Sequence, residues 1–89
     1  MNAIVTVFAR DDKGITAYVS TILAENEINI LDISQTLMHG HFTMIMLVDL
    51  SECKMPFDQL SAYLREMGEK RNLNMSITRQ DIFESMHRI

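Results

Sequence analysis

The spacing of apolar residues changes repeatedly along this chain, and the order of those changes is the feature that most restricts its possible folds. Residues 3–9 (AIVTVFA) are short, apolar and β-branched, which is typical of an interior strand. From Ile15 the apolar residues recur at helical spacing until residues 25–27 end the pattern. Residues 28–38 return to strand composition but carry several polar side chains, which favours an edge strand. The first half therefore predicts a strand, a helix and an edge strand.

The second half predicts the same kinds of element again. His39, Gly40 and His41 indicate a hairpin turn centred on Gly40, and residues 42–50 form the most apolar strand of the chain. Pro56 suits the first turn of the helix that follows. The apolar face of that helix would consist of Phe57, Leu60, Leu64 and Met67, opposite Asp58, Arg65, Glu66 and Glu69.

A last strand and a helical tail complete the pattern. Residues 75–80 have strand composition, and the tail places Ile82, Phe83, Met86 and Ile89 on one helical face. The order βαββαβ plus a tail predicts an α+β, ferredoxin-like sandwich. Right-handed crossovers then place both helices on one face of a four-stranded antiparallel sheet with strand order 4-1-3-2. We expect one domain over residues 1–89, with residues 82–89 as a short docked C-terminal helix.

Charge and cysteine content restrict the setting in which the protein works. The net charge is −4 and the basic residues are scattered, so the basic stripe that nucleic-acid binding needs is not visible. The single cysteine, Cys53, has no partner for a disulfide within the chain. The opening residues alternate like a strand and do not resemble a signal peptide, and the apolar run 42–48 is too short to span a bilayer. We expect a soluble cytoplasmic protein that binds neither nucleic acid nor membrane.

The most apolar strand suggests self-association. One alternating set of its side chains consists of Phe42, Met44, Met46, Val48 and Leu50, and the other contains Ile45 and Leu47. Because both sets are apolar, we expect both faces of this strand to be buried, although the two helices cover only one. A second copy, packed face to face or edge to edge, would cover the other face and make a homodimer or a higher oligomer. The C-terminal helix is the alternative cover.

The loop at residues 10–15 is the strongest candidate for a ligand site. It precedes the first helix, whose unpaired N–H groups and positive dipole end suit a carboxylate. Gly14 lets backbone approach a ligand closely, and Asp11 or Asp12 would accept a hydrogen bond from an ammonium group. A helix N-terminus beside an acid matches a zwitterion such as a free amino acid. The simpler interpretation is that one Asp caps the helix and Gly14 is a turn residue.

The stretch DDKGITAYVSTILAENEINILDISQT, together with FTMIMLVD and the MHRI ending, resembles the ACT domain. That domain typically reads D-x-x-G-I in its first loop, followed by LAE-x-x-INI. The resemblance covers essentially the whole chain and is greatest to small stand-alone ACT proteins of bacteria and archaea. It implies a homodimer with a regulatory amino-acid site at the subunit interface. Asp11, Gly14 and Ile15 match the loop of that site, and Asn29 matches the Asn after the first helix.

Two positions depart from the family pattern. Glu27 stands where a Gly usually precedes INI, and Lys13 stands where Pro or another apolar residue is common. The negative charge of Glu27 near Asn29 would weaken the binding of a carboxylate.

Metal and cofactor chemistry has weaker support. His39 and His41 flank the hairpin glycine and two imidazoles could meet a metal ion, but the sequence fixes no third ligand, so we expect no metal. Cys53 has no C-x-x-C partner, which excludes a copper-chaperone variant of this fold. No motif indicates a cofactor.

Three functions remain in competition. The leading one is a non-enzymatic regulatory module that senses an amino acid at a dimer interface and acts through a partner protein. The alternative is a ligand-free association module. An enzyme similar to acylphosphatases is less favoured: Arg10 and Asn29 would hold a phosphate, but Asp11 and Asp12 would repel it. RNA binding would use Phe8 or another exposed aromatic such as Phe42, and the acidic balance opposes it.

Overall fold

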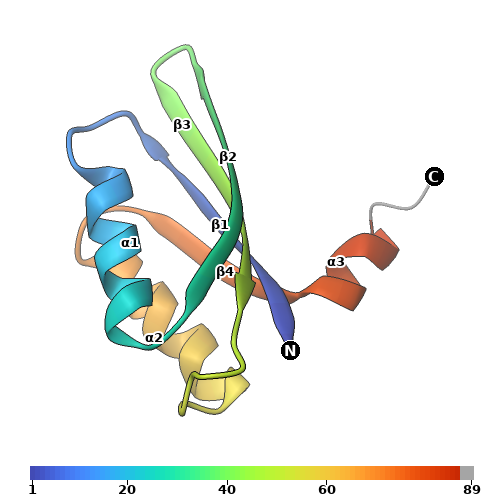
Figure 1. The fold of residues 1–89 in the computed structure, drawn as a ribbon. Helices are drawn as coiled ribbons and strands as arrows, with labels where there is room; N and C mark the ends of the chain where they lie inside the picture. The colour runs from blue at the N-terminus through green and yellow to red at the C-terminus, as the bar shows by residue number, and fades with distance from the viewer. Residues whose placement is uncertain (87–89) are drawn as a thin grey trace.

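The computed structural model describes residues 1–86, which form one antiparallel sheet and three helices (Figure 1). The strands are β1 (Asn2–Arg10), β2 (Asn29–Met38), β3 (His41–Asp49) and β4 (Asn74–Arg79), and the helices are α1 (Ile15–Glu25), α2 (Phe57–Glu69) and α3 (Gln80–Met86). The strand order is β2-β3-β1-β4, which confirms the predicted 4-1-3-2 order. Helices α1 and α2 lie together on one side of the sheet, and α3 lies away from them (Figure 1). The ferredoxin-like prediction is therefore confirmed.

The core lies between the sheet and the first two helices. On β1 the alternate residues Ala3, Val5, Val7 and Ala9 are buried, and Met44, Met46 and Val48 of β3 are buried beside them. Leu60 and Leu64 of α2 close the core from the helix side, as their spacing predicted. The hydroxyl of Tyr18 in α1 donates a hydrogen bond to the Met67 carbonyl in α2 at 2.7 Å, so the two helices are also joined directly.

Strand β2 is an edge strand, as predicted, and almost all of it is exposed. Its exposed residues include Leu31, Ile33, Leu37 and Met38. A bulge lies between Ile30 and Asp32 in its pairing with β3. Within the described residues nothing pairs with its outer edge, so a row of backbone donors and acceptors faces outward next to apolar side chains.

Two predicted boundaries shift by a residue. The hairpin turn consists of His39 and Gly40 alone, with φ of 52° and 78°, and His41 already pairs with Met38 inside the sheet. Two-residue turns with both φ values positive match the twist of the flanking strands. Pro56 occupies the position just before α2 rather than its first turn.

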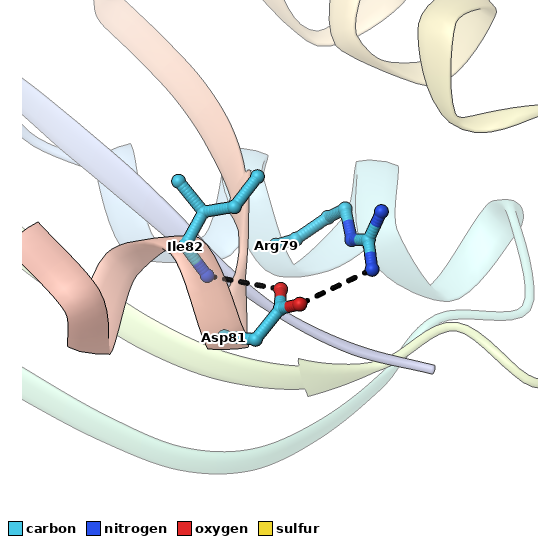
Figure 2. A network of polar contacts seen from close by, with 3 residues as sticks. All are labelled: Arg79, Asp81 and Ile82. Carbon is cyan, nitrogen blue, oxygen red and sulfur yellow. Dashed lines mark hydrogen bonds and ion pairs between the residues drawn. The ribbon is translucent and has the colours of Figure 1, made fainter.

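The tail differs more from its prediction. Helix α3 begins at Gln80 rather than residue 82, and its Ile82 and Met86 are 47% and 63% exposed. Two residues of the expected apolar docking face are therefore exposed, whereas Phe83 is half-buried and the fourth residue, Ile89, lies outside the described residues. Figure 2 shows how the chain enters α3: the Asp81 carboxylate accepts hydrogen bonds from the Arg79 guanidinium at 3.2 Å and from the Ile82 backbone N–H at 2.9 Å. Of the described helices, none has the length and apolar character needed to cross a membrane.

Candidate functional site

The loop between β1 and α1 presents an uncapped helix N-terminus. Gly14 is the capping residue, with a left-handed φ of 79°, and no side chain in residues 1–86 caps α1. The simpler interpretation, in which an Asp caps the helix, is therefore wrong. The Asp12 carboxylate instead accepts a hydrogen bond from the Lys13 backbone N–H at 2.7 Å. The first-turn N–H groups of α1 are left without a side-chain acceptor, which is the electrostatic arrangement that favours an anion.

The predicted loop residues divide into an exposed group and one buried residue. Asp11, Asp12 and Gly14 are exposed, and Ile15 is buried in the core, where it anchors the start of α1. A Cβ at Gly14 would meet nothing within 4 Å in the described chain, so the glycine is needed here for its left-handed backbone rather than for close packing. Exposed carboxylates beside an uncapped helix start are suited to the two ends of a zwitterion.

Asn29, by contrast, lies at the other end of the sheet. In the strand register Asn29 pairs with Asp49, and Asp49 pairs with Asn2 at the start of β1. The loop follows Arg10, which is at the opposite end of β1. The length of β1 from Asn2 to Arg10 spans roughly 26 Å at about 3.3 Å per residue. One protomer therefore does not bring Asn29 to the loop, and it does not form the Arg10–Asn29 pair that an acylphosphatase-like site would need.

A contact between α1 and β2 was missed by the sequence analysis. The Thr16 hydroxyl, in the first turn of α1, donates to the Gln35 side-chain oxygen at 3.4 Å. The alternation of β2 places Gln35 between Ile33 and Leu37 on the helix side, and this pattern is the signal that would have found it. The second half of β2 consequently lies beside the start of α1.

The Asn29 end of the sheet is acidic. The hydroxyl and the backbone N–H of Ser51 donate to the Asp49 carboxylate at 2.7 and 2.9 Å, and they hold the pKa of Asp49 below its ordinary value of 3.8. Glu27 lies just before Asn29 with a left-handed φ of 58°. Gly would adopt this conformation without steric cost, whereas Glu adopts it under strain.

The residues considered for RNA binding and for metal binding do not form a site of either kind as the sequence analysis described it. Phe8 is exposed on the open face of the sheet, whereas Phe42 packs against the core, so the two candidate stacking aromatics do not share a surface. Among the described residues there is no cluster of three or more His, Cys, Asp or Glu side chains that would hold a metal ion.

Comparison with known proteins agrees with the fold. The family model described as the ACT domain matches residues 2–78. A UPF0237 protein of Clostridium acetobutylicum is 52% identical over 89 residues, which is 100% of both chains, and one of Methanocaldococcus jannaschii is 48% identical over 97% of this chain and 96% of its own. The solved structure of an ACT domain protein from Streptococcus pneumoniae has a TM-score of 0.84 and 40% identity, over 94% of each chain. This chain therefore belongs to the ACT domain family.

Proposed function

We propose that this protein is a regulatory module that binds a free amino acid between two copies of the chain and acts through a partner protein. Membership of the ACT family supports a small-molecule-binding regulatory role. The observation that carries the choice of ligand is the uncapped start of α1 beside exposed Asp11 and Asp12. The carboxylate of an amino acid fits the helix N-terminus and its ammonium group fits the acidic side chains.

The separation of Asn29 from the loop is the reason for two copies. Antiparallel pairing of two β2 strands about a two-fold axis between Ile33 and Ser34 would exchange their ends. Met38 would then lie opposite Asn29 of the partner subunit, at the end of the sheet that carries the Asp11–Gly14 loop. Each of the two sites would combine the loop of one copy with the Asn29 of the other.

The outer edge of β2 supports this arrangement over face-to-face packing. It is ten residues long, lacks Pro and Lys, and exposes Leu31, Ile33 and Leu37. Natural proteins usually protect such an edge, because it pairs readily with another strand. Occupied sites at this junction would favour the dimer, and a partner protein that recognises one assembly state would respond to the population shift.

The experiment is thermal unfolding in the presence of each of the twenty amino acids, with light scattering after size exclusion on the same samples. A ligand at 100 times its dissociation constant stabilises the folded state by about 2.7 kcal/mol, which raises the unfolding temperature of a small domain by several degrees. Asp11→Ala and Asn29→Ala should each abolish the shift. Asp58→Ala, which removes an exposed acid from the first turn of α2, is the matched control and should leave it unchanged.

A ligand-free association module is the second candidate, and the acidic surroundings of Asn29 favour it. Glu27 and Asp49 would repel a carboxylate brought to that end of the sheet. A stable dimer whose unfolding temperature responds to none of the twenty amino acids would overturn the sensor proposal in favour of this one.

A further inference from the structure

The tip of the β2–β3 hairpin carries a hollow that the proposed amino-acid site does not use. It lies on the open face of the sheet and has a volume of about 280 Å³. Its lining consists of Phe8, Thr36, Met38, His39, His41 and Thr43. The hollow therefore brings one thioether and two imidazoles together within a segment of four residues.

The backbone explains why these three donors meet. Met38 and His41 are directly opposite each other in the strand register, so their side chains share one face, with Cβ atoms about 5 Å apart. His39 is the first residue of the two-residue turn and has a φ of 52°. Non-glycine residues rarely adopt this conformation, and Asn or Asp is the usual residue at this position of such a turn.

The imidazoles are available as ligands. No hydrogen bond of the His39 or His41 imidazole to another residue is found in the described part of the chain. The ring of His41 stacks on that of Phe8, with centroids 5.9 Å apart and an angle of 11° between the planes. This stack restricts the orientation of the His41 ring at the rim of the hollow.

From this arrangement we infer that the hollow binds a soft monovalent metal ion, Cu(I), through the Met38 sulfur and the imidazoles of His39 and His41. Thioether and imidazole ligands select Cu(I) over harder cations. No carboxylate or thiolate of the described residues lines the hollow, so Mg²⁺ and Ca²⁺ lack the oxygen ligands that they prefer. Zn²⁺ would find the two imidazoles, but the third donor of the hollow is a thioether, which suits the softer Cu(I) better. Arg10 of β1 pairs with His41 in the strand register. Its positive charge repels a divalent ion more strongly than a monovalent one.

The test measures metal binding in a Cys53→Ser background, because the lone thiol is itself a strong ligand for soft metals. Ag(I) serves as a redox-inert probe, and Cu(I) is titrated anaerobically against a chromophoric chelator. We expect one ion per protomer, with affinity reduced at least tenfold by Met38→Leu and by His41→Gln. Met86→Leu is the matched control, since Met86 and Met38 are 63% and 62% exposed, and it should not change the affinity.

A second measurement needs no substitution in the hollow and so does not depend on how the variants fold. In NMR spectra of the Cys53→Ser protein, one equivalent of Ag(I) should shift the ε-methyl signal of Met38 and leave that of Met86 in place. Loss of binding on removal of Cys53, full affinity in Met38→Leu, or equal uptake of Zn²⁺ would each overturn the assignment. An unmoved Met38 methyl signal at saturation would do the same.

Discussion

The backbone N–H of Asp11 donates a hydrogen bond to the carbonyl oxygen of Gly40 at 2.8 Å. This bond joins the loop that begins the candidate amino-acid site to the tip of the β2–β3 hairpin, which lies at the same end of the molecule (Figure 1). The carbonyl is correctly placed only while Gly40 keeps its left-handed φ of 78°. The conformation of the hairpin turn thus contributes to the position of the acidic loop.

Gly40→Ala should therefore destabilise the fold by about 1–2 kcal/mol, the cost of a left-handed L-residue. A Cβ there would meet nothing within 4 Å in the described chain, so the effect is conformational and not steric. Gly40→Asn is the control and should cost less, because Asn tolerates this region. Chemical denaturation measures the stability, and the amide signal of Asp11 reports the hydrogen bond. Equal losses in the two variants would contradict this account.

A substitution at Glu27 should increase the stability of the fold, whereas Gly40→Ala should decrease it. The Glu27 φ of 58° follows the end of α1, where the Ile28 N–H donates to the Leu23 carbonyl at 2.9 Å. Glu27→Gly should stabilise the protein by about 0.5–1 kcal/mol, because the relief of left-handed strain exceeds the added backbone entropy of the unfolded chain. The same change two residues earlier, Glu25→Gly, places glycine in the last helical turn and should destabilise by up to about 1 kcal/mol. A loss of stability in Glu27→Gly would refute the argument.

Glycine is required at position 68 because of close packing, and not because of its backbone angle. It is buried inside α2, and a Cβ would lie 2.7 Å from the Leu73 carbonyl oxygen and about 3 Å from the Met75 side chain. Gly68→Ala should therefore destabilise by about 1–3 kcal/mol, although alanine is the better helix former. Glu66→Ala, on the exposed face of the same helix, should change the stability by less than about 0.5 kcal/mol. Urea unfolding of both variants checks the contrast.

The sequence predicted most of the fold because local patterns and the handedness of crossovers act together. The change from strand to helix at Ile15 and the polar residues of β2 were enough to place an edge strand correctly. The short C-terminal helix was predicted, but the burial of its apolar residues was not predicted correctly, for a physical reason. Apolar residues on one helical face, such as Ile82 and Met86, show that a surface can be buried, and they do not specify whether the same chain buries it.

The candidate site was predicted less completely. Glycine at position 14 follows from a local backbone requirement, so the motif could identify it. The distance between Asn29 and the loop is a consequence of strand register, which no local motif contains. Met38 was not recognised as a neighbour of the two histidines because its position opposite His41 depends on the length of the turn.

The stability of the fold should depend on pH through Asp49. Ser51 lowers the pKa of Asp49 in the folded protein, so this carboxylate adds stability above its ordinary pKa of 3.8, and that contribution is lost as the pH falls through the lower folded value. Ser51→Ala removes the hydroxyl donor, which is the larger cause, and should raise the pKa of Asp49 toward 3.8. Carboxyl ¹³C NMR titration measures the change. An unchanged pKa of Asp49 in Ser51→Ala would contradict this account.

A mixed dimer tests whether each amino-acid site is shared between two copies. Asp11→Ala removes the loop acid and Asn29→Ala removes the residue at the far end of β2, so dimers of either variant alone should not bind. In a mixed dimer, one site joins the intact loop of the Asn29→Ala chain to the intact Asn29 of the Asp11→Ala chain, while the other site carries both substitutions. Random exchange of equal amounts makes about half of the dimers mixed, so about a quarter of all sites should recover. Calorimetric titration of the mixture with the amino acid found in the unfolding screen would measure that fraction. If no binding returns although subunit exchange is verified by mass, each site is built within one protomer and the β2-paired arrangement is wrong.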